Sequence, residues 1–307
     1  MSSSRHAKTL ERACDGEHLA IWGLAGQQQL EIVLSELLAE RESRGSRVPV
    51  VSLLMRGRED AEWIERAVRW LSLRGRRVIV RTRVVMPRPV VTALHQAHGC
   101  EDGCEGRRGG GAVVELELAH HKPAIQRALL GQQADPAAAL LLQAQHLETL
   151  EIPVVARLGP LMPGIHDQGN GFTPLLRNVE AADVSRIVLQ IGQLHPQQIR
   201  ALVDCQRELT AAGVLELARA YGVSAMTMLG GTELPADEDG VVHKLKSRRA
   251  QAFTHGLERL VTDAGLELPG CGCQSHCELT PQRAANDYEA GYESVMGRDL
   301  FAGLAGC

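Results

Sequence analysis

Short apolar, β-branched runs alternate with helical segments through most of this chain. The runs with strand character are residues 18–23, 48–54, 77–84, 112–118, 153–158 and 186–191. Apolar residues at helical spacing fill the intervals, at residues 27–44, 61–73, 88–98, 123–130, 136–150 and 172–182. A strand, a helix and another strand in succession are typical of a parallel sheet with crossover helices. The order therefore predicts an α/β fold.

About six β/α units precede Gly192, which favours a partial TIM-like (β/α)6 barrel over a closed barrel of eight units. The predicted domains are a polar N-terminal segment at 1–19, the partial barrel at 20–192 and a helical, cysteine-containing extension at 193–307. Within the extension, residues 195–221 predict a long helix or a helix pair. Residues 241–264 predict a basic helix.

Composition restricts the class of partner. The net charge of −4 and the pI near 6.3 provide no general attraction to nucleic acid, so a nucleic-acid partner needs a local patch such as the basic helix at 241–264. No apolar run reaches the roughly 18 residues that a membrane span requires. We therefore expect no membrane partner and a cytoplasmic location, whereas a protein partner stays open.

Residues 152–167 predict a buried strand that leads into a functional loop. Gly159, Pro160, Pro163 and Gly164 are expected to end the strand at 158 and to shape a loop that contacts a ligand or cofactor. In barrels of parallel strands, the loops at the carboxyl ends of the strands carry the chemistry.

Histidines mark the same rim. His166 and Asp167 end the loop, and His120 and His121 follow the strand at 112–118. Because histidine titrates near neutral pH, these residues are candidates for proton transfer or anion binding. The alternative is that they are ordinary polar residues of the rim.

Arginines follow two of the other predicted strands. Arg56 and Arg58 lie in the loop after the strand at 48–54, and Arg81 lies near the end of the next strand. Guanidinium groups at such positions favour a phosphate or carboxylate ligand. A solvated charged loop is the alternative.

The order of the units and two phrases resemble the radical S-adenosylmethionine superfamily, and within it the spore photoproduct lyase-like branch. The phrases are RRVIVRTR at 76–83 and IPVVARLGPLMPGIHD at 152–167, and the likeness covers residues 20–192. The resemblance implies a partial barrel that binds an iron–sulfur cluster and S-adenosylmethionine and acts as a lyase. A role in DNA repair would rest on analogy of fold alone.

The chain departs from that family at the cluster loop. The family holds its cluster through a C-x3-C-x2-C loop near the first strand, and this sequence contains no such triplet. The nearest register begins at Cys14 and places His18 and Ile21 at the other positions, and isoleucine cannot bind iron. Either the cluster is lost or its loop is missing from this version of the chain. Arg56 and Arg58 also stand where the family has an acidic residue, and cations disfavour a sulfonium cofactor.

Clustered cysteines near the C-terminus predict a metal site. Cys271, Cys273 and Cys277 form a C-x-C-x3-C loop with His276 inside it, and Cys307 is a possible further ligand. Thiolates and an imidazole suit a tetrahedral zinc ion or an iron–sulfur cluster. Redox-active thiols and thiols without a function are the alternatives.

Three hypotheses follow. In the first, the chain is a radical S-adenosylmethionine-like barrel that has lost the standard cluster and acts as a binding or partner subunit. In the second, it is an active iron–sulfur enzyme whose cluster is built unusually. In the third, it is a non-radical α/β barrel that binds an anionic small molecule, a phosphate or a carboxylate, at the rim.

Overall fold

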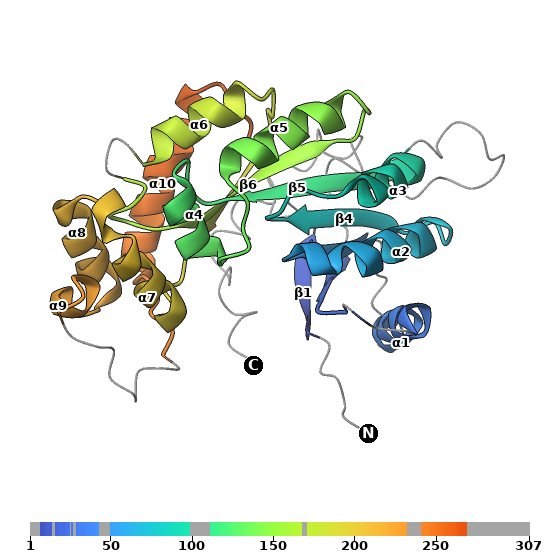
Figure 1. Cartoon of the computed structure of the whole chain (residues 1–307), viewed down its shortest axis with the longest axis horizontal. Coiled ribbons are helices and arrows are strands. Elements are labelled where there is room, and N and C mark those ends of the chain that lie inside the picture. Colours follow the sequence, from blue (N-terminus) through green and yellow to red (C-terminus); the bar gives the residue numbers. More distant parts are fainter. Residues whose placement is uncertain are drawn as a thin grey trace. The chain divides into compact units, whose positions relative to one another are not determined.

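The computed structural model describes residues 7–13, 16–24, 26, 29–42, 50–98, 111–167, 171–231 and 241–268 (Figure 1). Seven strands form one sheet, in the order β1-β2-β3-β4-β5-β6-β7. They are β1 (Ala7–Ala13), β2 (Gly16–Trp22), β3 (Val50–Met55), β4 (Arg77–Thr82), β5 (Ala112–Leu118), β6 (Val154–Leu161) and β7 (Ile187–Ile191).

Strand β1 pairs with β2 in antiparallel orientation, and β2 to β7 form a six-stranded parallel arrangement. Parallel neighbours need a crossover connection, which is usually a helix. The strands follow one another in chain order, so right-handed crossovers place successive helices on the same face of the sheet.

The helices alternate with the strands as the sequence predicts. Before β7 they are α1 (Leu30–Glu42), α2 (Ala61–Ser72), α3 (Arg88–His98), α4 (Pro123–Leu130), α5 (Ala137–Glu148) and α6 (Phe172–Glu180). After β7 come α7 (Pro196–Asp204), α8 (Ala211–Tyr221), α9 (Ala225–Met228) and α10 (Ser247–Asp263). The predicted α/β class, with parallel strands and alternating helices, is confirmed.

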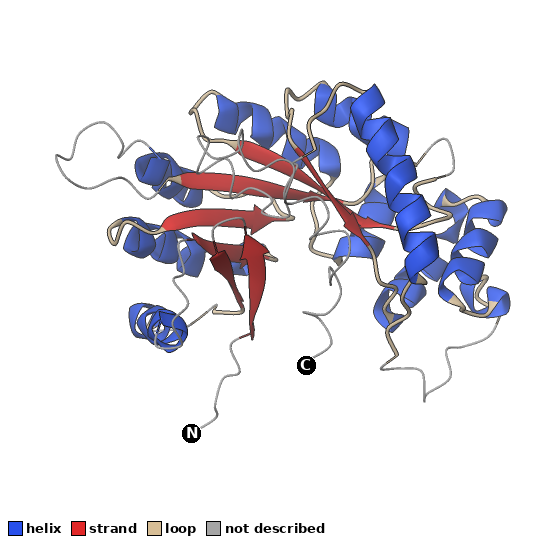
Figure 2. Cartoon of the chain, turned by 180° about the vertical axis from the view of Figure 1, so that it is seen from behind, coloured by secondary structure: helices blue, strands red, loops and turns tan. Residues whose placement is uncertain are grey.

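The chain divides into two compact units. Among the described residues, unit 1 contains those up to Leu116 together with His146–Val155. Helices α1, α2 and α3 lie along one face of its strands, and the strands are in front when the chain is seen from behind (Figure 2). Helix α2 turns an apolar stripe inward, and its buried members are Trp63, Ile64, Ala67, Val68 and Leu71.

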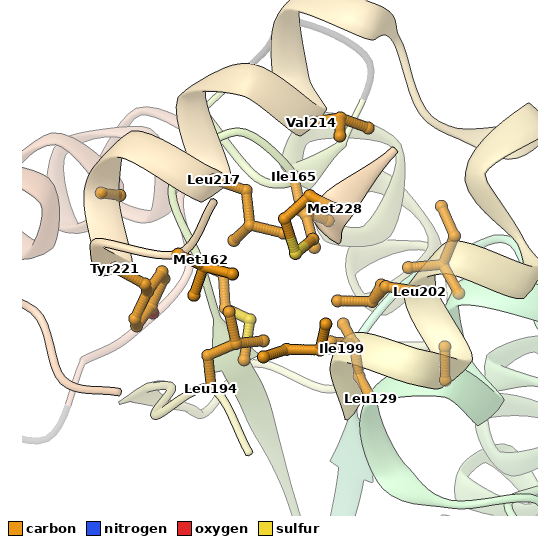
Figure 3. Packing of buried hydrophobic residues seen from close by; sticks show 14 of the residues in the cluster. Leu129, Met162, Ile165, Leu194, Ile199, Leu202, Val214, Leu217, Tyr221 and Met228 are labelled. Atoms are coloured by element: carbon orange, nitrogen blue, oxygen red, sulfur yellow. The ribbon is translucent and has the colours of Figure 1, made fainter. Parts of the chain in front are cut away.

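Unit 2 contains residues Glu117–Gln145 and Ala156–Leu268. Its core is a cluster of buried side chains from α4, α7, α8, α9 and the segment after β6 (Figure 3). Leu217 and Tyr221 of α8 pack there with Met162 and Ile165 of that segment. The Tyr221 hydroxyl donates a hydrogen bond to the Gly192 carbonyl at 2.8 Å.

The predicted end of β6 at residue 158 is wrong. The strand continues through Gly159 and Pro160 to Leu161, with a shift of register between Leu158 and Leu161. A Cβ atom at position 159 would lie 2.6 Å from the carbonyl oxygen of Gln190, so glycine permits the close approach of β7. The shift of register lets the strand accept a proline that lacks an N–H group.

Other boundaries also differ. Strand β1 lies in the segment predicted only as polar, the 195–221 region is a helix pair, and the basic helix begins at Ser247 rather than at 241. None of the helices in the described part of the chain has the length and apolar character of a membrane span. The predicted domain boundaries stay a prediction.

Candidate functional site

Three histidines of unit 2 come together at the carboxyl ends of β5 and β6. His120 and His121 follow β5, with ring centroids 4.3 Å apart and planes 26° from parallel. His166, in the loop after β6, meets His120 edge-on at 5.9 Å between centroids. The structure thus brings together the three histidines that the sequence places at one rim, and their catalytic role stays a prediction.

Both ring nitrogens of His166 are bonded to the backbone. Nε2 donates to the Ala119 carbonyl at 2.7 Å and therefore carries a ring proton. Nδ1 lies 2.9 Å from the Met162 backbone nitrogen and 3.2 Å from the Met162 carbonyl oxygen, and in the neutral ring it accepts the Met162 N–H. The side chain is 2% exposed, and burial lowers its pKa. His166 thus joins two loops of the backbone as a neutral ring.

His120 is held in the same way. The Lys122 N–H donates to Nδ1 at 2.9 Å, which places the ring proton on Nε2. Gln126 fixes the backbone here, since its Oε1 accepts the N–H groups of Ala119 and His120 at 2.8 and 2.9 Å. Burial, with the neighbouring His166, lowers the pKa of His120 to about 2. The ring is therefore neutral at pH 7.

His121 is the most open of the three rings. Burial lowers its pKa, and a hydrogen bond with the Gly171 backbone acts in the opposite direction. Its Nδ1 atom is buried and makes no hydrogen bond to the described part of the chain. His121 is thus the third ring of a cluster in which burial disfavours the charged forms.

The charged residues beside the histidines are paired locally. The Asp167 carboxylate accepts the Gly164 N–H at 2.6 Å, which closes the loop on itself. The Lys122 ammonium lies 3.2 Å from the Glu208 carboxylate and also donates to the Glu208 carbonyl at 2.8 Å. Asp167 and Lys122 are therefore both engaged in contacts within unit 2.

The predicted ligand-contacting residues of the loop are packing positions. Pro163 and Gly164 are buried, and Gly164 has φ +83°. A Cβ atom at 164 would collide with the carbonyl oxygen of Gly213 in α8, and one at 213 would collide with that of Gly164. Two glycines thus allow the loop and α8 to cross in backbone contact.

Unit 1 presents a different arrangement after β3. The Asp60 carboxylate is buried and accepts three N–H groups. They are the Arg56 and Gly57 backbone N–H groups, at 2.8 and 3.3 Å, and Trp63 Nε1 at 2.7 Å. Asp60 thereby fixes the backbone of the loop, while the side chains of Arg56 and Arg58 are exposed.

The ends of three successive strands meet around Arg56. Its guanidinium carbon lies 4.9 Å from the centre of the Trp22 ring, at the end of β2. Arg83, just after β4, donates from Nε to the Arg56 carbonyl at 3.2 Å. The Trp22 ring, the exposed Arg56 and the half-buried Arg83 therefore lie together at the carboxyl ends of β2, β3 and β4, and the exposed Arg58 follows two residues after Arg56. We call Trp22, Arg56, Arg58 and Arg83 the arginine cluster.

Arg81, predicted with the loop arginines as a ligand contact, is buried instead. Its Nε lies 2.6 Å from the Glu115 carboxylate on the neighbouring strand, and their side chains are 8% and 0% exposed. A buried ion pair of this kind binds two strands to each other. Arg81 therefore differs from the exposed Arg56 and Arg58.

The sequence reasoning missed several residues that shape these sites. Trp22, Asp60, Arg83 and Gln126 were not candidates. Arg83 carried a usable signal, because it directly follows the β4 strand end, as Arg56 follows β3. The bonds of Asp60 and Gln126 to the backbone have no signature in the sequence.

The predicted metal ligands Cys271, Cys273, His276, Cys277 and Cys307 lie outside the described residues. Within the described residues, no group of three or more His, Cys, Asp and Glu side chains is arranged to hold a metal ion. The sequence matches no protein-family model, and no curated protein matches it.

Proposed function

We propose that this chain binds a small anionic molecule, a phosphate or a carboxylate, at the arginine cluster. The observation that carries the proposal is the meeting of Arg56, Arg83 and Trp22 at the ends of three parallel strands. In α/β proteins with parallel strands, this edge of the sheet is the usual place for ligands.

The Arg56 side chain is placed to act as a flat, forked hydrogen-bond donor to an anion. The Arg56 guanidinium lies over the Trp22 ring, and a guanidinium has N–H groups that can donate to two oxygens of one phosphate or carboxylate. The buried Asp60 carboxylate points its oxygens at Arg56 N, Gly57 N and Trp63 Nε1. These bonds fix the backbone that carries Arg56.

The resemblance to radical S-adenosylmethionine enzymes is part of the proposal. The strand and helix order supports it, and a partial barrel that binds a ligand without the standard cluster fits best. The connection between β2 and α1, residues 23–29, reads GLAGQQQ and contains no cysteine, although the family holds its cluster near the first strand. Since Arg56 and Arg58 disfavour a sulfonium, the expected ligand is an anion and not S-adenosylmethionine.

The test is calorimetric titration with inorganic phosphate and with citrate, at constant ionic strength set by sodium chloride. Asp60 bonds the backbone of residue 56, so Arg56→Ala leaves the loop fixed. We expect Arg56→Ala to weaken binding about tenfold or more, since hydrogen bonds to charged groups contribute roughly 1.5–3 kcal/mol. Arg177→Ala, an exposed arginine of α6, is the matched control.

Equal binding by Arg56→Ala and Arg177→Ala would refute the proposal. So would wild-type protein that binds neither anion, or that binds S-adenosylmethionine more tightly than phosphate.

The C-terminal cysteines support a second candidate, a metal-binding function. Their C-x-C-x3-C spacing, with His276 inside it, suits zinc or an iron–sulfur cluster. Iron, sulfide and zinc analysis of anaerobically purified protein, before and after Cys273→Ala, tests this candidate. Iron with sulfide, together with reductive cleavage of S-adenosylmethionine that Cys273→Ala abolishes, would favour the enzyme. Zinc alone would favour a structural site.

A further inference from the structure

A second cationic and aromatic region of unit 1 lies between α1 and α2, two helices that lie side by side (Figure 1). A groove of about 390 Å³ opens there. Its lining residues are Ser35, Leu38 and Ala39 from α1, Trp70 from α2, and Arg74 and Arg76 from the turn that follows. The volume is within the range of small-molecule sites.

Arg74 is fixed in this groove by the tryptophan. Its guanidinium carbon lies 3.8 Å from the centre of the Trp70 ring, and Nη1 donates to the Trp70 carbonyl at 3.3 Å. No carboxylate of the described residues forms a salt bridge with Arg74. The cation is exposed, held in place and beside an apolar wall formed by Leu38 and Ala39.

The position of Arg74 alone has a simpler explanation. It follows the C-terminus of α2, where the negative end of the helix dipole stabilises any cation. The helix dipole does not explain why a groove is present or why its lining combines apolar, aromatic and cationic side chains. An indole, two aliphatic side chains and a hydroxyl beside the Arg74 guanidinium are complementary to a ligand that is apolar at one end and anionic at the other.

We infer that the groove between α1 and α2 binds an organic anion with a flat apolar group, such as a nucleoside monophosphate. The flat group lies against Trp70 and Leu38, and the phosphate or carboxylate accepts hydrogen bonds from Arg74. The Ser35 hydroxyl supplies a further polar contact. This site is separate in sequence from the arginine cluster, and it differs in having the apolar side chains of Leu38 and Ala39 in its lining.

The experiment is calorimetric titration with adenosine 5′-monophosphate, and with adenosine and inorganic phosphate as probes of each half of the ligand. We expect the monophosphate to bind at least about tenfold more tightly than either probe. Arg74→Ala should weaken its binding about tenfold, and Ser35→Ala by a few fold. Because both side chains are exposed, these variants should keep their fold, which far-ultraviolet circular dichroism checks.

Arg56→Ala separates this inference from the proposed function. The inference requires that Arg56→Ala leaves binding of the monophosphate unchanged. It is overturned if Arg56→Ala abolishes binding while Arg74→Ala does not, a result that would leave the proposed function standing. It is also overturned if the wild-type protein binds the monophosphate no more tightly than phosphate, or not at all.

Discussion

The histidines of unit 2 and Arg56 of unit 1 both lie at strand ends, but they differ in whether their side chains are buried by bonds to the backbone. In unit 2, His166 and His120 bond to backbone groups and are buried, so their rings are neutral parts of the fold. In unit 1, Asp60 takes the backbone bonds and Arg56 remains exposed with its charge. The comparison teaches that a polar side chain at a strand end can be buried by its own bonds to the backbone, and that it stays exposed where another residue makes those bonds.

The largest expected effect concerns the buried arginine of unit 1. Glu115→Gln leaves the Arg81 charge buried without its carboxylate, which should lower the free energy of unfolding by about 3–5 kcal/mol. Urea unfolding followed by tryptophan fluorescence measures this, because all three tryptophans, Trp22, Trp63 and Trp70, lie in unit 1. The exposed Glu62→Gln serves as the control, and a loss below about 1 kcal/mol for Glu115→Gln would contradict a structural role.

The next effect concerns His166. His166→Ala leaves the Met162 N–H and the Ala119 carbonyl without partners and creates a cavity, so we expect a loss of about 3 kcal/mol. Circular dichroism during urea unfolding measures the loss, with the exposed His146→Ala as control. Without urea, where the variant is folded, its affinity for phosphate should equal that of the wild-type protein. If His166→Ala is as stable as wild type but loses phosphate binding, then the ligand binds at the histidines and not at the arginine cluster.

Acid should destabilise the protein through the histidines. The pKa of His120 is lowered from 6.5 to about 2 in the folded chain, mainly by burial. Below pH 6.5 the unfolded chain therefore binds a proton that the folded chain does not, and stability falls as the pH falls. The slope is about 1.4 kcal/mol per pH unit for each such histidine, and the lowered pKa of His166 acts in the same direction.

His120→Asn isolates this contribution. Asparagine offers an oxygen near the position of Nδ1, so it can still accept the Lys122 N–H, but it does not titrate. Urea unfolding between about pH 6 and pH 4.5 should give a shallower dependence for the variant. Parallel pH profiles of the variant and the wild-type protein would show that His120 is not a buried neutral ring.

The smallest effect concerns the exposed pair beside the histidines. Lys122 and Glu208 have side chains that are 40% and 48% exposed, so their ion pair contributes little. Glu208→Gln should change the free energy of unfolding by less than about 0.5 kcal/mol, because Lys122 keeps its bond to the Glu208 carbonyl. Phosphate titration of this variant also tests whether an unpaired Lys122 creates a second anion site. If Glu208→Gln binds phosphate more strongly than wild type, then the histidine region of unit 2 can also bind an anion.

Most of the fold was predictable, because hydrophobic periodicity is a local property of the sequence. Strand β1 was missed since its sequence mixes Lys8, Glu11 and Arg12 with few apolar residues. The extension of β6 through Gly159 depends on contact with β7, which periodicity does not encode.

The site was predictable only in part. Histidines that follow neighbouring parallel strands must come near each other, so their cluster followed from the order of the strands. Their role did not follow, because it depends on where the N–H groups of Met162 and Lys122 point. The arginine cluster joins Trp22 and Arg83, which are 61 positions apart, and this contact depends on the tertiary structure.

One measurement tests the contrast between the two regions most directly. A nitrogen–proton correlation spectrum at pH 7, with phosphate added stepwise, observes the tryptophan indoles and the histidine rings in the same sample. The account predicts that the Trp22 indole signal moves on addition of phosphate while the ring signals of His120 and His166 stay at their neutral positions. Movement of the histidine signals with a stationary Trp22 signal would contradict it.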